Sequence, residues 1–89
     1  MRYEFDPTKN KANIAKHGVD MAMAEEFDFD TAVESADTTQ DYGEARFSAI
    51  GYISGRLYIL IYTPRKGSIR IISLRKAKKK EQQKYYDQA

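Results

Sequence analysis

The sequence predicts an α+β domain spanning residues 1–89, with a mostly antiparallel sheet of about four to five strands, two N-terminal helices and a C-terminal helix. The stretch from residue 56 to residue 77 is rich in Ile, Leu and Tyr, with one short interruption that has Pro first and Gly last. This pattern is typical of two long strands joined by a hairpin loop. Outside the hairpin, residues that typically begin and end helices bound several segments, which predicts helices there. Helices segregated from consecutive strands indicate the α+β class, and 89 residues make one domain.

The N-terminal segment predicts a short strand followed by a helix. Arg2–Phe5 alternates polar and aromatic residues, as a strand with one buried face does. Asp6 can cap the helix, and Pro7 suits its first position. The helix is expected to run to about Lys16 and to stop at Gly18.

A second helix is expected over residues 21–27, with Asp20 as its cap. Residues 31–35 predict another strand. The following segment, residues 36–45, is polar and rich in turn formers, which indicates an exposed loop.

The C-terminal half predicts three strands and a helix. Residues 46–53 form the first strand, and a turn at Ser54 and Gly55 leads into the hairpin strands 57–63 and 68–75. Residues 76–89 consist mainly of helix formers.

The hairpin loop sets an expected register. A four-residue loop, Pro64–Gly67, would pair Thr63 with Ser68, whereas an odd-length loop would shift this pairing. One face is then almost wholly apolar, with Arg70 as its charge, and is expected to be core. The other face mixes apolar, aromatic and cationic groups and suits an anionic ligand. The expected core face comprises Leu57, Ile59, Ile61, Ile72 and Leu74, and the mixed face comprises Arg56, Tyr58, Leu60, Tyr62, Ile69, Ile71, Ser73 and Arg75.

Composition narrows the class of protein. The chain has no cysteine, which excludes disulfides and suits a cytoplasmic location, and it has no apolar run of membrane-spanning length and no signal-peptide pattern. The formal net charge of +2 conceals an acidic first half and a basic second half. The basic half indicates either a polyanionic partner or attraction between the two halves within the fold.

The candidate functional residues are cationic and aromatic. Arg65 and Lys66 lie at the hairpin tip, and Arg75 leads into a run of lysines. Arginine binds phosphate through two parallel hydrogen bonds, and tyrosines can stack on bases. Each has a structural alternative: the lysine run as a solvated helix face, Tyr58 and Tyr62 as sheet packing, and His17 as a helix C-terminal residue. No metal-ligand spacing and no glycine-rich phosphate loop is present, so no cofactor is expected.

Three segments in this order, FDPTKNKANIAKHGV, GEARFSAIG and IYTPRKGSIRIISLRKAKKKE, resemble the BrnT family of bacterial ribonuclease toxins. The resemblance covers residues 3–86. The chain departs from the family pattern at Phe5, where Trp is frequent, and at Asp20-Met21, where Ser-Phe is frequent; both changes concern packing and capping.

The resemblance implies a toxin of a type II toxin–antitoxin pair with a RelE-like fold that cuts RNA directly. Its implied partner is a ribbon-helix-helix antitoxin (BrnA-like), in a heterotetramer that binds operator DNA through the antitoxin. Arg65 and Arg75 match the family's active-site segments, and His17 and Arg46 match other motif positions.

RNA can be cut without a metal when its 2′-hydroxyl attacks the adjacent phosphate, provided that the enzyme aligns the groups and stabilises charge. We expect Arg75 and Arg65 to hold phosphates and Tyr62 or His17 to move a proton. Further contacts with RNA are expected from Arg46, Arg56, Tyr58, Lys66, Lys76 and Lys79.

Two other functions fit the same basic sheet: a non-catalytic RNA-binding module and a purely protein-binding subunit that docks an acidic partner.

Overall fold

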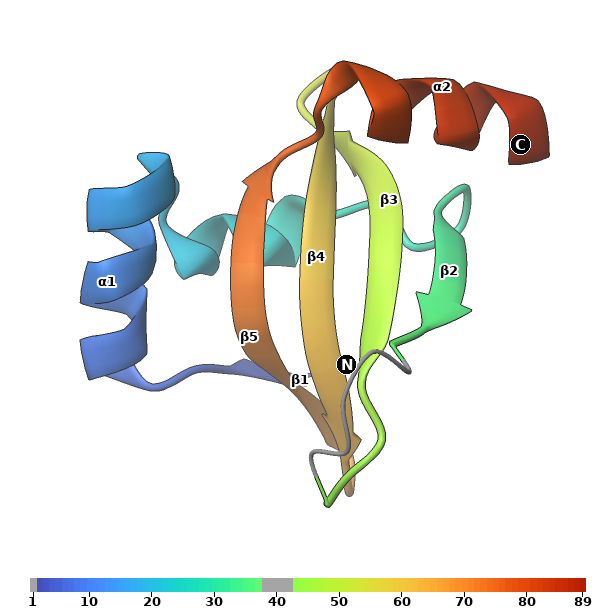
Figure 1. The fold of residues 1–89 in the computed structure, drawn as a ribbon. Coiled ribbons are helices and arrows are strands. Elements are labelled where there is room, and N and C mark those ends of the chain that lie inside the picture. Colours follow the sequence, from blue (N-terminus) through green and yellow to red (C-terminus); the bar gives the residue numbers. More distant parts are fainter. Residues whose placement is uncertain (1, 38–42) are drawn as a thin grey trace.

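The structure is a computed structural model that describes residues 2–37 and 43–89 (Figure 1). The middle of the loop expected over residues 36–45 lies outside these residues. The elements are β1 (Arg2–Glu4), α1 (Pro7–His17), the 3₁₀ helix η1 (Met21–Glu26), β2 (Val33–Ala36), β3 (Phe47–Ile53), β4 (Arg56–Arg65), β5 (Ser68–Lys76) and α2 (Lys79–Gln88).

The five strands form one sheet in the order β1-β5-β4-β3-β2. Strands β2 to β5 pair antiparallel, but β1 pairs with β5 in parallel. The α+β class and the C-terminal helix are confirmed. The sheet is mixed rather than mostly antiparallel, because the N-terminal strand joins the far side of β5 instead of pairing with a sequence neighbour.

Capping residues set the start of both N-terminal helices and the end of α1. The Asp6 carboxylate accepts a hydrogen bond from the Thr8 N–H at 2.8 Å, and α1 ends at Gly18, whose φ of +69° is left-handed. Asp20 caps the next segment by accepting from the Ala22 N–H at 2.9 Å. That segment is a six-residue 3₁₀ helix rather than an α-helix, so the expectation of two N-terminal α-helices was met by only one.

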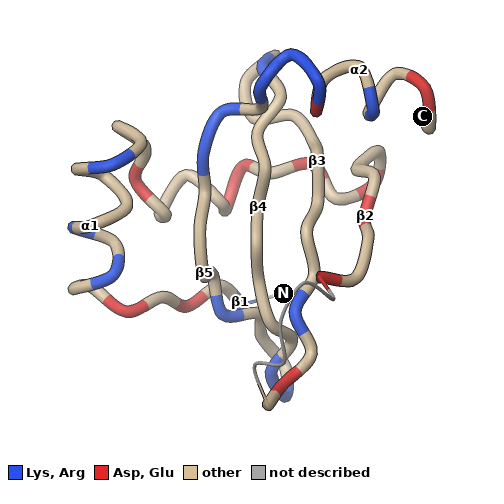
Figure 2. The backbone as a smooth tube through the Cα atoms, viewed as in Figure 1, with Lys and Arg blue, Asp and Glu red and all other residues tan. Residues whose placement is uncertain are grey.

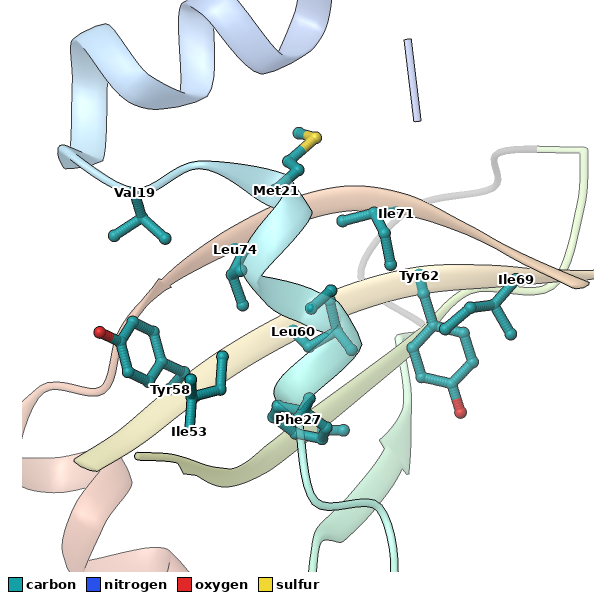
Figure 3. Packing of buried hydrophobic residues seen from close by; sticks show 12 residues of the cluster. Val19, Met21, Phe27, Ile53, Tyr58, Leu60, Tyr62, Ile69, Ile71 and Leu74 are labelled. Atoms are coloured by element: carbon teal, nitrogen blue, oxygen red, sulfur yellow. The ribbon is translucent and has the colours of Figure 1, made fainter. Parts of the chain in front are cut away.

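The larger core lies between η1 and the sheet (Figure 3). Phe27 packs against β3 at Gly51, where a Cβ atom would lie 2.6 Å from the Phe27 ring, so any larger residue would displace that ring. The buried members of this cluster are Val19, Met21, Ala24, Phe27, Ala49, Ile53, Tyr58, Leu60, Tyr62, Ile69, Ile71 and Leu74. The face expected to be a mixed binding surface is therefore the main core face, and the prediction of which face is core was wrong.

The hairpin register also differs from the prediction. The turn has only two residues, Lys66 and Gly67, so Arg65 pairs with Ser68 and Thr63 pairs with Arg70. Pro64 is tolerated inside β4 because β3 pairs with β4 only as far as Tyr62. The edge of β4 that faces β3 therefore has no ladder partner at Pro64.

A β-bulge in β5 also changes which of its side chains lie on each face of the sheet. The register shifts between Ile61 and Tyr62, which pair with Ser73 and Ile71, so Ile72 is the extra residue. Beyond the bulge, Leu74 pairs with Leu60 on the η1 side. Ser73 and Arg75 consequently move to the opposite face of the sheet, together with Leu57, Ile59 and Ile61.

That opposite face, here called the front face, is turned to the viewer in Figure 1. Helix α2 covers its upper end, where Tyr85 is buried and its hydroxyl donates to the Thr31 carbonyl at 3.1 Å. The second apolar cluster lies here and comprises Ile50, Leu57, Ile59, Ala77 and Tyr85. Below α2, no described element covers β3, β4 and β5 (Figure 1). No helix in the described ranges has the length and apolar character needed to cross a membrane.

Candidate functional site

A cleft of about 500 Å³ lies where the end of α1, the end of β5 and the start of α2 meet. Its lining is entirely basic: Lys16, His17, Arg75, Lys76 and Lys78. We call it the cationic cleft. Figure 2 shows the same concentration of basic residues at the top of β5 and the start of α2, with α1 alongside. An array of cations on three elements suits an anionic ligand such as a nucleic acid backbone.

Asn13 holds α1 in position against β5. Its side-chain amide donates to the carbonyls of Val19 and Leu74, both at 2.8 Å, and its Oδ1 accepts from the Leu74 N–H at 3.3 Å. Because β1 pairs only with Ser68–Arg70, the edge of β5 at Leu74 has no strand partner, and the buried Asn13 amide takes that place. His17, one helical turn further along α1, is thereby brought to the end of β5.

Arg75 is held by Glu81 of α2 through two hydrogen bonds, Nη1 to Oε1 at 2.8 Å and Nη2 to Oε2 at 2.7 Å. Glu81 Oε1 also accepts from the Lys78 N–H at 2.7 Å. The hydrogen bonds from Arg75 lower the pKa of Glu81, and those to Glu81 raise the pKa of Arg75, so both stay charged. The pair fixes the guanidinium at the wall of the cleft, with the side chain 23% exposed.

His17 has a pKa below its usual value of 6.5. Burial is the largest cause, followed by the positive charges of Lys16, Arg75 and Lys78. The imidazole is therefore mostly neutral at pH 7 and can accept a proton. It is the half-buried, uncharged base among the cations of the cleft.

A groove adjoins the cationic cleft and continues along α1. Its volume is about 320 Å³, and it runs between α1 and β5, with Ile72 and Ser73 on its strand side. Lys16 and His17 line both cavities, and Lys9 lies further along the groove. The basic surface thus extends beyond the cleft toward the start of α1.

Three of the expected site residues lie away from the cationic cleft, at the other end of the sheet. Arg65 is the last residue of β4, and its guanidinium lies 3.4 Å from Glu44 with 44% of the side chain exposed. Lys66 follows in the turn, and half-buried Arg46 precedes β3. A strand rise of about 3.3 Å per residue places Arg65 and Arg75 roughly 20 Å apart.

Tyr58 and Tyr62 are core residues, 7% and 9% exposed, on the face covered by η1. The Tyr62 hydroxyl donates to the Glu34 carboxylate, and burial together with this bond raises the pKa of Tyr62. A buried ring cannot stack on a base, and a phenol with a raised pKa is a poor base near neutral pH. The structure therefore separates both tyrosines from the cationic side chains they were expected to assist.

The remaining expected residues are dispersed. Arg56, at the start of β4, lines a separate pocket beside α2, and Lys79 is exposed at the start of α2. Arg70 forms an ion pair with Glu4, 3.6 Å away, which matches a structural role. Lys16 and Glu81 were not predicted at the site, and Lys78 was expected only as part of the lysine run that follows Arg75. The adjacency of Lys16 to His17 was the available signal for Lys16, whereas Glu81 required knowledge of the β5–α2 connection.

No group of three or more His, Asp or Glu side chains that could hold a metal ion occurs within residues 2–37 and 43–89.

A family model described as "Ribonuclease toxin, BrnT, of type II toxin-antitoxin system" matches residues 5–81. The chain belongs to the BrnT family. It is similar to the crystal structure of the Brucella abortus ribonuclease toxin BrnT, with a TM-score of 0.68 and 31% sequence identity over 89% of this chain and 99% of that chain. A comparison with curated proteins gave no significant match.

The resemblance predicted from three sequence segments is thus confirmed. As a member of the BrnT family, the protein has the role of a ribonuclease toxin, and a type II system implies an antitoxin as its partner. The match spans α1, β5 and the first residues of α2, and so includes every residue that lines the cationic cleft.

Proposed function

We propose that this BrnT family member is a metal-independent endoribonuclease and that the cationic cleft binds the scissile phosphate of RNA. The observation that carries the proposal is the convergence of four cations and one neutral imidazole in a single cleft of about 500 Å³. This arrangement supplies both charge stabilisation and a proton acceptor, the two requirements of RNA transesterification.

In the proposed reaction, His17 takes the proton of a 2′-hydroxyl group. The 2′-oxygen attacks the adjacent phosphorus atom, and the bond from phosphorus to the 5′-oxygen breaks. The leaving oxygen receives a proton from solvent or from a lysine ammonium of the cleft. The products are a 2′,3′-cyclic phosphate and a 5′-hydroxyl end.

Arg75 is proposed to stabilise the negative charge that builds up on the phosphorane. It is suited to this role because Glu81 fixes its guanidinium before RNA arrives, and a preorganised donor loses little free energy on reaction. Arg65 lies roughly 20 Å away and therefore cannot contact the same phosphate. We assign it to a neighbouring phosphate, together with Lys66.

We further propose that the antitoxin is a ribbon-helix-helix protein of the BrnA-like type, that the two form a heterotetramer binding operator DNA through the antitoxin, and that the toxin fold is RelE-like. The front face below α2 is uncovered by any described element, and it leads to the cationic cleft through Ser73 and Arg75. A partner seated there would block RNA from the cleft.

The proposal is tested by incubating the purified protein with end-labelled RNA in excess EDTA. We expect cleavage to persist and to leave 2′,3′-cyclic phosphate or 3′-phosphate ends. The Arg75→Ala variant, purified identically, controls for contaminating nucleases. Loss of cleavage on chelation, with recovery on addition of magnesium or zinc, would show that a metal takes part.

A further inference from the structure

A pocket of about 350 Å³ lies beside the cationic cleft, between α2 and the β3–β4 turn. The aromatic and cationic residues that line it are Tyr52, Arg56, Lys76 and Tyr86. Lys76 lines both this pocket and the cationic cleft, so the two cavities adjoin. The volume is within the range of small-molecule sites, about 300 to 1,000 Å³.

Tyr86 offers an exposed but fixed aromatic face. Its residue is 59% exposed, while its neighbour Tyr85 is buried and packs edge-on against the Tyr86 ring at a centroid distance of 5.7 Å. The hydroxyl groups of Tyr86 and Tyr52 lie 3.4 Å apart, within hydrogen-bond distance. A ring held from two sides loses little conformational freedom when another ring stacks on it.

We infer that this pocket is a subsite for one unpaired nucleotide of the RNA substrate, with its base stacked on Tyr86 and its phosphate held by Arg56 and Lys76. The inference rests on the proposed function and narrows the substrate class to single-stranded RNA.

The chemistry of the pocket matches that ligand. An aromatic face beside two cations is the combination that binds single strands without reading their sequence. The hydrogen bond to Tyr86 raises the pKa of Tyr52, so the phenol stays neutral and does not repel a phosphate. Bases inside a duplex are already stacked on their neighbours and cannot turn onto a protein ring.

The position of the pocket fits the path of a strand through the cleft. Arg75 and Lys76 are consecutive, with Cα atoms about 3.8 Å apart. A strand whose phosphate contacts Arg75 therefore brings an adjacent nucleotide within reach of Lys76. Tyr86 lies beyond residues 5–81, which the family model matches.

The test measures binding of a short 2′-O-methylated oligoribonucleotide that carries a fluorescent adenine analogue, because methylation removes the attacking hydroxyl. We expect Tyr86→Ala to weaken binding about tenfold, near the lower end of the effect of losing one stacked base, and Tyr86→Phe to retain most of it. Ile14→Ala, which removes another exposed apolar side chain (42% exposed), is the matched control and is expected to bind normally. Duplex RNA is expected to bind Tyr86→Ala as it binds the wild-type protein.

Three results would overturn the inference. Normal single-strand binding by Tyr86→Ala would show that no base stacks there. Equal weakening of single-strand and duplex binding would show that Tyr86 does not contact an unpaired base specifically. Unchanged RNA binding with weakened binding of the antitoxin would identify the pocket as a protein interface. If the wild-type protein cleaves RNA in any of these cases, the proposed function stands, whereas wild-type protein that neither binds nor cleaves RNA refutes the proposed function itself.

Discussion

Replacing Arg75 by alanine removes the guanidinium that the structure holds most firmly at the cationic cleft. Two hydrogen bonds to Glu81, at 2.7 and 2.8 Å, fix this group before any substrate binds. Loss of one preorganised donor of this kind lowers the chemical rate by about 100-fold to 1,000-fold. Because other cations of the cleft remain, we expect the affinity for RNA to fall much less than the rate.

The same substitution has a cost in stability that must be separated from the loss of activity. The Glu81 side chain, 26% exposed, would retain only the Lys78 N–H among its hydrogen bonds described here. Stranding a partly buried charge in this way costs about 1 to 3 kcal/mol. A domain of 89 residues has a stability of about 4 to 13 kcal/mol, so the variant should still be folded at 25 °C.

The assay is single-turnover cleavage of labelled RNA, with affinity measured separately by filter binding and folding checked by thermal unfolding. Arg70→Ala is the matched control, since Arg70 lies on the same strand and face and is also ion-paired, but with Glu4 away from the cleft. Arg65→Ala is expected to weaken binding and to flatten its dependence on salt while largely sparing the cleavage step. Abolished cleavage in Arg65→Ala with weakened binding alone in Arg75→Ala would reverse our assignment. Cleavage within threefold of wild type in both variants would exclude these arginines from the reaction.

Three further predictions concern the base, the partner and the scaffold. Because the pKa of free His17 lies below 6.5 and its neutral form is the base, kcat/KM should fall on the acidic side with a midpoint below pH 6.5; an unchanged acidic limb in His17→Gln would assign that limb to another group. Co-expression with a ribbon-helix-helix protein encoded beside the toxin should give a stable complex that no longer binds RNA and should relieve growth arrest; failure of both would refute the partner. Asn13→Ala should destabilise the fold by about 3 kcal/mol or more, since it leaves three backbone groups without partners, as chemical denaturation would measure. Asn10→Ala, whose amide bonds lie nearer the surface, should cost less, and equal losses would contradict the role of Asn13.

Local signals in the sequence predicted local structure well. Asp6, Pro7 and Gly18 define α1 because capping and left-handed geometry depend on a few neighbouring residues. The turn at Ser54 and Gly55, both with positive φ, was predicted for the same reason.

Register and face could not be predicted because they depend on distant partners. Pro64 indicated a loop, yet it lies within β4 because β3 ends before reaching it. Both faces of the hairpin are apolar enough to be core. The larger core forms on the face that carries Leu60, and not on the face that carries Ile59, because η1 packs there. The bulge at Ile72 then moves Arg75 to the front face, a shift that strict alternation cannot show.

The sequence predicted the types of residue at the candidate site better than it predicted which of them lie together. Arg75, His17 and Lys76, all expected at the site, line one cleft, and their binding of phosphate stays a prediction. Lys16 and Glu81 were missed because their roles arise only when α1 and α2 converge at the end of β5.

The parallel pairing of β1 with β5 has a consequence for the order of folding. Asn13 and its partner Leu74 are 61 positions apart in sequence, so α1 cannot be fixed until β5 has been synthesised. Contacts between such distant parts of a chain form late, because the loop between them must close first. On a translating ribosome, His17 therefore emerges long before Arg75, and the two halves of the cleft stay apart during most of synthesis. The cationic cleft can therefore form only after residue 78 has been synthesised, because α1, β5 and the start of α2 all line it.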